Sequence, residues 1–194
     1  MAKLDYLVWE PDWRDGVCRL SALEGVEDQA DLAYSLPRAH DFPSAARFAM
    51  DPDFPHDTLL ADRLVNLSGL VVASERIANY LRSKELPFVE YLPVSVVDHR
   101  GRDVGEPYFI VHPVEPVECL DVDACAPRWN KIRPGKIRGV RQLALDPERV
   151  DASRGIFACD AFHKPKLIRR DLARDMTDFG FTGSRFVETE EYRG

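Results

Sequence analysis

The apolar and polar positions of this chain form a pattern that occurs twice. Residues 72–91 carry apolar side chains at the same relative positions as residues 167–186, and matching positions such as Ile77 and Leu172 are 95 residues apart. Both copies predict the end of a strand, an amphipathic helix, a short turn and a second strand. A duplicated packing unit explains these residues without any chemistry.

The ends of the two predicted helices carry local signals. Ser74 is a candidate N-cap residue, and Glu75 lies in the first turn, where an acidic side chain stabilises the helix dipole. We expect the second helix to run from Lys166 to Phe179. It should stop at Gly180, because glycine suits the left-handed residue of a Schellman motif.

Runs of β-branched and aromatic residues predict the strands. These span residues 4–9, 45–50, 70–72, 88–97, 107–111, 117–122, 137–145, 156–159 and 182–187, with a β-hairpin over 88–111. Loops are expected over residues 10–43, with one short strand, and over 51–57 and 126–136, where turn residues gather. The chain should therefore be α+β, with a mixed, largely antiparallel sheet and two main amphipathic helices in the duplicated strand-helix-strand unit.

The length of 194 residues suits one domain. We divide it into a strand- and loop-rich part over 1–65, an α+β core over 66–188 that continues from it, and a frayed tail over 189–194. No apolar run approaches the roughly 20 residues that span a bilayer. The start, Met1 to Tyr6, contains no secretion signal. We therefore expect a cytoplasmic protein.

The four cysteines predict thiols rather than a metal site. Cys18, Cys119, Cys125 and Cys159 include no C-x-x-C pair of the kind that binds zinc. In the cytoplasm they should be reduced and mostly buried, and a disulfide between Cys119 and Cys125 is the alternative.

Two further candidates for chemistry have simpler structural explanations. Asp121 and Asp123 would share one face of a strand and resemble a carboxylate pair that holds a metal, but two carboxylates are too few, so we expect a solvated strand end. Cys159 and His163 are close enough in sequence to form a thiol–imidazole pair, but the apolar strand around Cys159 favours a core cysteine. We therefore expect no catalytic residue, no metal and no cofactor.

Charge is distributed unevenly along the chain. The formal net charge of −7 combines −12 over residues 1–126 with +5 over residues 127–194. Six cations with no acid between them follow one another beside a tryptophan in the basic segment 128–141: Arg128, Lys131, Arg133, Lys136, Arg138 and Arg141. A second basic cluster contains Lys164, Lys166, Arg169, Arg170 and Arg174. The functional interpretation is a surface for nucleic acid, phosphate or another anionic partner, and the alternative is a solvated basic loop.

The acidic side chains gather in clusters that would attract a basic partner. The two sets that we single out as candidate partner-binding residues are Asp51, Asp53 and Asp57, and Glu115, Glu118 and Asp123. The simpler interpretation is that they keep the protein soluble.

Five segments from Leu70 onward occur in an order that resembles a known family. They are Val71 to Ile77, Glu90 to Val94, Tyr108 to Val111, Cys119 to Asp121, and Gly180 to Phe186. In this order they resemble the eleventh catalogued immunity-protein family of bacterial polymorphic toxin systems, formerly a domain of unknown function. The resemblance covers residues 66–188, and residues 1–55 match only loosely.

The resemblance implies a small, non-enzymatic cytoplasmic protein that binds a cognate toxin and neutralises it. It brings no catalytic residues with it. We expect the toxin as the partner, and neither nucleic acid nor a membrane. If the toxin is a basic nuclease, the acidic sets are the preferred contact surface. The alternative function is a nucleic-acid- or phosphate-binding module that uses the basic segment 128–141.

Overall fold

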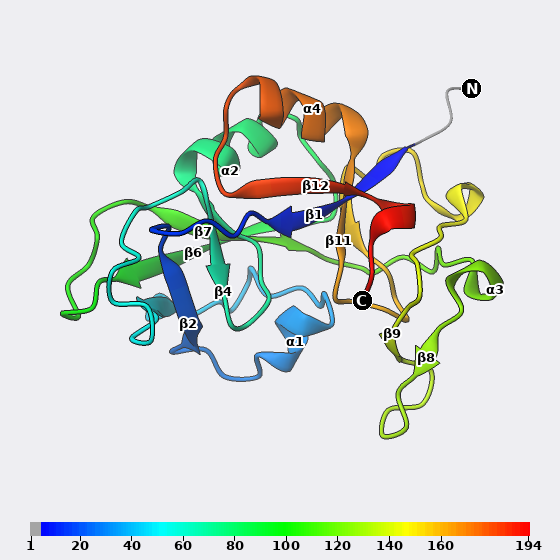
Figure 1. The fold of residues 1–194 in the computed structure, drawn as a ribbon, viewed down its shortest axis with the longest axis horizontal. Coiled ribbons are helices and arrows are strands. Elements are labelled where there is room, and N and C mark those ends of the chain that lie inside the picture. The colour runs from blue at the N-terminus through cyan, green and yellow to red at the C-terminus, as the bar shows by residue number, and fades with distance from the viewer. Residues whose placement is uncertain (1–4) are drawn as a thin grey trace.

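A closed barrel and a four-stranded sheet lie next to each other, and two helices pack side by side against both (Figure 1). The computed structural model describes residues 5–194, apart from the side chain of Pro147. Residues 1–4 lie outside this part. The first residue of the strand predicted over 4–9, and most of the segment Met1 to Tyr6 for which no secretion signal is expected, are therefore outside the described residues.

The barrel strands, in spatial order, are β2 (Arg19–Glu24), β3 (Arg47–Met50), β6 (Val89–Val97), β7 (Tyr108–Pro113), β5 (Val72–Ser74) and β4 (Arg63–Asn66). The sheet contains β10 (Ile156–Ala158), β11 (Lys166–Arg169), β1 (Tyr6–Pro11) and β12 (Ser184–Glu188). A separate ribbon pairs β8 (Arg128–Trp129) with β9 (Ile137–Gly139). The helices are α1 (Ala30–Ala33), α2 (Glu75–Arg82), α3 (Val122–Cys125) and α4 (Arg170–Asp178), with 3₁₀ turns at Pro147–Arg149 and Thr189–Glu191. The predicted α+β class is confirmed.

The apolar repeat corresponds to a repeated structural unit. In β5–α2–β6 and in β11–α4–β12, one antiparallel strand lies between the two outer strands: β7 in the first unit and β1 in the second. The paired residues, in the order outer, central, outer, are Val72, Ile110 and Leu92 in the first unit and Leu167, Val8 and Val187 in the second. The outer-strand residues that pair with the central strand in one unit are therefore 95 positions from those that pair in the other unit, so the two units share the same strand register. The predicted duplication is confirmed.

The two helices meet at matching positions. The Tyr80 hydroxyl donates to Asp175 Oδ2 at 3.1 Å, and these two residues are 95 apart. Contact between equivalent residues is what a local two-fold axis between the helices produces. Ile77 and Leu172, another matching pair, are both buried in the apolar cluster that the helices share. The duplicated apolar positions thus pack against each other.

The predicted helix ends are confirmed at two of three positions. Ser74 caps α2, since its hydroxyl accepts from the Ile77 amide. α4 stops in a Schellman motif, in which the Gly180 amide donates to Thr177 and the Phe181 amide donates to Met176. The predicted start of this helix at residue 166 is wrong. Residues 166–169 form β11, because β1 and β10 bond to it on both sides.

Loss of the Ser74 cap gives a test of this unit. In Ser74→Ala, the Ile77 amide and Asp62 Oδ1 both lose a hydrogen bond to the serine hydroxyl. We expect the free energy of unfolding to fall by about 1–2 kcal/mol, measured by urea denaturation. Ser83→Ala, at the exposed C-cap position of the same helix, should change it by less than about 0.5 kcal/mol. Equal effects of the two variants would contradict the capping role.

Several other predicted elements are wrong, for reasons of tertiary packing. The strand predicted over 117–122 contains only two isolated bridges and leads into α3. The strand predicted over 137–145 ends at Gly139. The tail over 189–194 is not frayed, because Tyr192 is buried and the Gly194 carbonyl accepts from the Val140 amide.

Asp62, immediately before β4, connects the two units. Its Oδ1 accepts from the Ser74 hydroxyl at 2.9 Å, and its Oδ2 accepts from the Thr182 amide at 2.8 Å and from Arg76 at 3.1 Å. Ser74 belongs to the first unit, and Thr182 to the turn that closes the second. This carboxylate therefore fixes the start of β4 at the seam between barrel and sheet.

Candidate functional site

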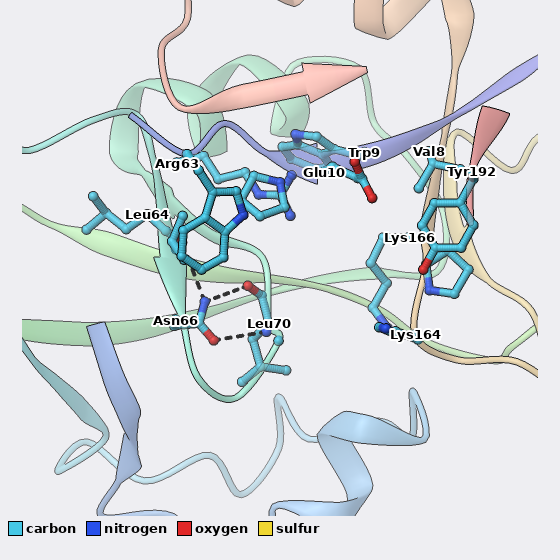
Figure 2. Close-up of a pocket in the computed structure, with 15 residues that line it drawn as sticks. Val8, Trp9, Glu10, Arg63, Leu64, Asn66, Leu70, Lys164, Lys166 and Tyr192 are labelled. Carbon is cyan, nitrogen blue, oxygen red and sulfur yellow. Dashed lines mark hydrogen bonds between the residues drawn. The ribbon is translucent and has the colours of Figure 1, made fainter. Parts of the chain in front are cut away.

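Two adjoining cavities open at the seam between the barrel and the four-stranded sheet. The first has a volume of about 210 Å³ and is lined by β1, β4, residues 164–166 and Tyr192 (Figure 2). The second, of about 310 Å³, is lined by residues of the segments 33–34, 68–70, 130–138 and 161–166. Lys164 and Lys166 line both. We call the two cavities together the basic cleft.

The walls of the basic cleft carry cations and almost no acid. The basic residues that line it are Arg63, Lys164, Lys166, Arg133, Lys136 and Arg138. Glu10 is the only acidic residue among those that line either cavity, and its carboxylate pairs with Arg185. The cleft therefore concentrates positive charge in a protein whose net charge is −7.

Arg63 is the deepest of these cations. It is 5% exposed, and neither Nε nor Nη1 has a hydrogen-bond partner in the described part of the chain. The guanidinium carbon lies 5.0 Å from the centre of the Trp9 ring. Burial lowers the pKa of Arg63, but a guanidinium stays charged at neutral pH. A charged group without a hydrogen-bonding partner is expensive to bury, so this position calls for an explanation.

Lys166 is a second buried cation in the same cavity. It is 7% exposed, and its Nζ donates to the His163 carbonyl at 2.7 Å. Burial is the largest of the effects that together lower the pKa of Lys166 from 10.5 to about 8; Cys159 opposes the shift, and the Arg63 cation adds to it. The two buried cations therefore repel each other across the cavity.

This pKa predicts a pH dependence. Between about pH 8 and pH 10.5 the unfolded chain holds the Lys166 proton and the folded chain does not, so this residue makes stability rise with pH. In phosphate-free buffer at pH 7, Lys166→Met should raise the free energy of unfolding by up to roughly 3 kcal/mol, and the gain should shrink toward pH 10.5 in urea titrations. Lys164→Met, at an exposed position, should change stability by less than about 0.5 kcal/mol. A destabilised Lys166→Met at pH 7 would contradict this.

His163 lies in the second cavity, and neither of its ring nitrogens has a partner in the described residues. Burial, followed by Lys136 and Lys166, lowers its pKa to about 4, so the ring is neutral at pH 7. Its ring packs against Tyr34 in a T-shaped arrangement, with ring centres 5.2 Å apart. His163 therefore has two buried ring nitrogens without hydrogen bonds behind the wall of the second cavity.

The cysteine expectations are confirmed in part. All four thiols are free and buried. The Cys159 thiol contacts Cys119 Sγ at 3.5 Å, so its close partner is neither His163 nor an activating base. The hydrogen bond to Cys119, together with burial, raises the pKa of Cys159. A neutral core thiol is a poor nucleophile, as expected for a structural cysteine.

The basic segment 128–141 forms a hairpin arm that extends away from the body of the molecule (Figure 1). Three of its six cations, Arg133, Lys136 and Arg138, line the second cavity. At the arm, Trp129 is 50% exposed and Ile132 is 89% exposed. We call Trp129, Lys131 and Ile132 the arm tip.

The remaining cations of the segment divide into two kinds. Arg128 donates to the Gly194 carbonyl at 2.9 Å and so holds the C-terminal residue. Lys131 and Arg141 are exposed, and neither makes an ion pair within residues 5–194. Sequence reasoning found this segment, but it did not show that one part faces the cleft and another faces solvent.

The first acidic set is not a continuous exposed surface, because two of its members are engaged within the protein. Asp51 is buried, and its Oδ1 accepts from the Asp53 amide. Asp57 accepts from the Gly16 amide and pairs with Arg19 at 3.1 Å. Both carboxylates hold the loop together, which leaves only Asp53 fully exposed.

The second acidic set is exposed. Glu118 pairs with Arg149 at 3.4 Å, and Glu115 lies 3.7 Å from Arg154, while Asp123 is in the first turn of α3. Asp121 does not share a strand face with Asp123, because it caps α3 by accepting from the Ala124 amide. In residues 5–194 no three His, Cys, Asp or Glu side chains are grouped so as to hold a metal ion.

The comparison with protein families gives a match over nearly the whole chain: the immunity protein family Imm11 matches residues 11–191. The chain belongs to this family. The Imm11 match extends the resemblance seen in residues 66–188 into the first barrel strands, and family membership suggests that the protein neutralises a toxin. No curated protein matches the Imm11 chain. Within residues 5–194, none of its helices is long and apolar enough to cross a membrane.

Proposed function

We propose that this Imm11 protein neutralises a cognate bacterial toxin in the cytoplasm by binding it directly, without catalysis, and that the arm tip is the contact surface. Family membership supports the toxin as partner. The observation that carries the choice of surface is the exposure of Trp129 and Ile132, which are three residues apart in the sequence, on a projecting hairpin. Large apolar side chains held out in water on one feature mark an interaction site.

The composition of the arm tip suits a protein partner. Aromatic side chains supply much of the binding energy at protein interfaces when they enter a pocket of the partner. Lys131 stands between the two apolar residues, and Arg141 is exposed in the same segment. We therefore expect a partner surface that has an apolar recess with acidic residues around it.

The second acidic set remains a competing contact surface. Glu115 and Glu118 are exposed, but each already has an arginine neighbour. The pair of Glu118 with Arg149 is exposed and contributes little, so Glu118 can exchange Arg149 for a lysine or arginine of a basic toxin, whereas Arg154 beside Glu115 is buried. The arm tip is preferred because its apolar groups gain more by leaving water.

The experiment that tests the function is co-expression with the toxin domain encoded by the adjacent gene. A stoichiometric complex that survives gel filtration, together with loss of toxicity, would support the proposal. Toxicity that persists in the presence of the folded protein would contradict it.

The same purification distinguishes toxin binding from the alternative function, which is nucleic-acid binding by the basic segment 128–141. Random DNA or RNA bound by the arm should dissociate steeply as salt increases. Recovery of nucleic acid in place of the toxin would favour that alternative function.

A further inference from the structure

The first cavity of the basic cleft lies apart from the arm tip. It is lined by Arg63, Lys164 and Lys166, and Figure 2 shows Arg63 beside Trp9 on one side, with the two lysines and Tyr192 on the other. Its volume of about 210 Å³ is many times the room that one water molecule needs. Nothing in the immunity function described above uses it.

The donors of Arg63 have no acceptor in the protein. Nε and Nη1 are buried and without a hydrogen-bond partner in the described residues. The neighbouring Asn66 cannot serve, because its Oδ1 accepts from the Leu70 amide at 3.0 Å and its Nδ2 donates to the Leu70 carbonyl at 2.7 Å (Figure 2). Glu10 pairs with Arg185.

The contact with Trp9 does not remove this deficit. An aromatic ring attracts the face of a guanidinium, whereas the N–H donors point outward in the guanidinium plane. The other β4 residues that line the cavity include Leu64 and Val65, which are buried and apolar, so an apolar residue would fit the environment of position 63. An arginine there has a use only if something accepts its hydrogen bonds.

Lys166 and Lys164 give the cavity further positive charge. Lys166 is buried, with only the His163 carbonyl as acceptor, and Lys164 is exposed. The cavity holds these three basic residues against one carboxylate, Glu10, which attracts Arg63 but is already paired with Arg185. This excess of positive charge matches an anion with more than one negative charge better than a single carboxylate. A phosphate group has this charge, and its oxygens accept paired hydrogen bonds from a guanidinium.

The geometry points to a phosphate site: the cavity binds the phosphate group of a small phosphorylated molecule, with Arg63 and Lys166 as its buried ligands and Lys164 at the entrance. The apolar walls, among them Val8, Pro11 and Leu64, leave space for an organic portion. This site stands independently of the proposed toxin binding, since it uses other residues.

The test is calorimetric titration of the phosphate-free protein with inorganic phosphate and with adenosine monophosphate, in chloride buffers of matched ionic strength. The wild type should bind phosphate and show a rising melting temperature. Arg63→Met and Lys166→Met should each bind about tenfold to a hundredfold more weakly. Arg174→Met, which removes an exposed arginine of α4, should bind like the wild type.

Each outcome is decisive. Tighter binding of adenosine monophosphate than of inorganic phosphate would assign the site to an organic phosphate, and the reverse order would assign it to the free ion. Absence of binding to the wild type, or equal binding by Arg63→Met, would overturn the proposal. Folding of the variant is not the obstacle, because removing a buried charge without a partner should make the phosphate-free Arg63→Met more stable than the wild type.

Discussion

Replacing Gly183 by alanine is expected to lower the free energy of unfolding by roughly 3–5 kcal/mol, the range of a severe backbone conflict. A Cβ atom at this position would lie 2.1 Å from the Arg63 carbonyl oxygen and 3.0 Å from Ala61 Cβ. The backbone of Gly183 also has a φ of +78°, which L-residues adopt only at a cost. The Arg63 carbonyl belongs to β4, which pairs with β5, so it cannot move aside without disrupting the contact between barrel and sheet.

The seam depends on this close approach. The Gly183 carbonyl accepts from the Asp12 amide at 3.0 Å, and the Thr182 carbonyl accepts from the Arg63 amide at 3.1 Å. The turn thus connects the end of β1 with the start of β4. Displacement of Gly183 would weaken both bonds and reposition Arg63, so Gly183→Ala should also reduce phosphate binding at the proposed site.

Gly180→Ala is the matched control, three residues earlier in the same turn. Gly180 has a similar φ of +67°, but a Cβ there would meet no atom within 4 Å. Only the conformational cost of about 1–2 kcal/mol applies. Urea denaturation of both variants separates steric conflict from conformational strain. Similar losses for the two would show that the contact with Arg63 is not what makes Gly183 necessary.

The second large effect concerns the arm tip. The double variant Trp129→Ala, Ile132→Asp should weaken toxin binding by a hundredfold or more, because it removes two apolar anchors and places a charge where one of them enters the partner. Both side chains are exposed, so the free energy of unfolding should stay within about 0.5 kcal/mol of the wild type. Binding is measured by surface plasmon resonance with the purified toxin domain.

The comparison variant is the triple reversal Glu115→Lys, Glu118→Lys, Asp123→Lys. If the arm tip is the contact surface, this variant should retain its affinity within a few-fold. If the toxin is basic and docks on the second acidic set, the opposite result is expected: the triple variant should lose toxin binding, and the double variant should retain it. The latter result would refute the arm tip and leave toxin binding itself intact.

The sequence was most informative for features of the structure that depend on residues close together in the chain. The cap at Ser74, the stop at Gly180 and the hairpin over 88–111 depend on local hydrogen bonds and backbone preferences, and all three are present. The apolar repeat was also readable, because each copy must bury the same face of a helix. The ordered segments in turn identified the family.

Other features could not be predicted, because they depend on strands that are distant in the chain. The sequence does not show that a central strand separates the outer strands of each unit, since β7 follows its unit and β1 precedes its own. Nor does it show that Arg63 is buried, because arginine side chains are mostly exposed and its burial depends on the strands around β4. The pairing of Asp57 is hidden for the same reason, because its partner Arg19 lies in another segment of the fold.

The sequence by itself therefore determined the α+β class, the duplicated unit, the cap at Ser74, the stop at Gly180 and the family of this protein. Only the tertiary structure decided which charges remain available. It assigned Asp57 to Arg19, left Trp129 and Ile132 in water, and enclosed Arg63 with Lys166 in one cavity. The physical reason is that burial and pairing of a charge depend on atoms brought together by folding, whereas periodicity and capping depend on residues within a few positions.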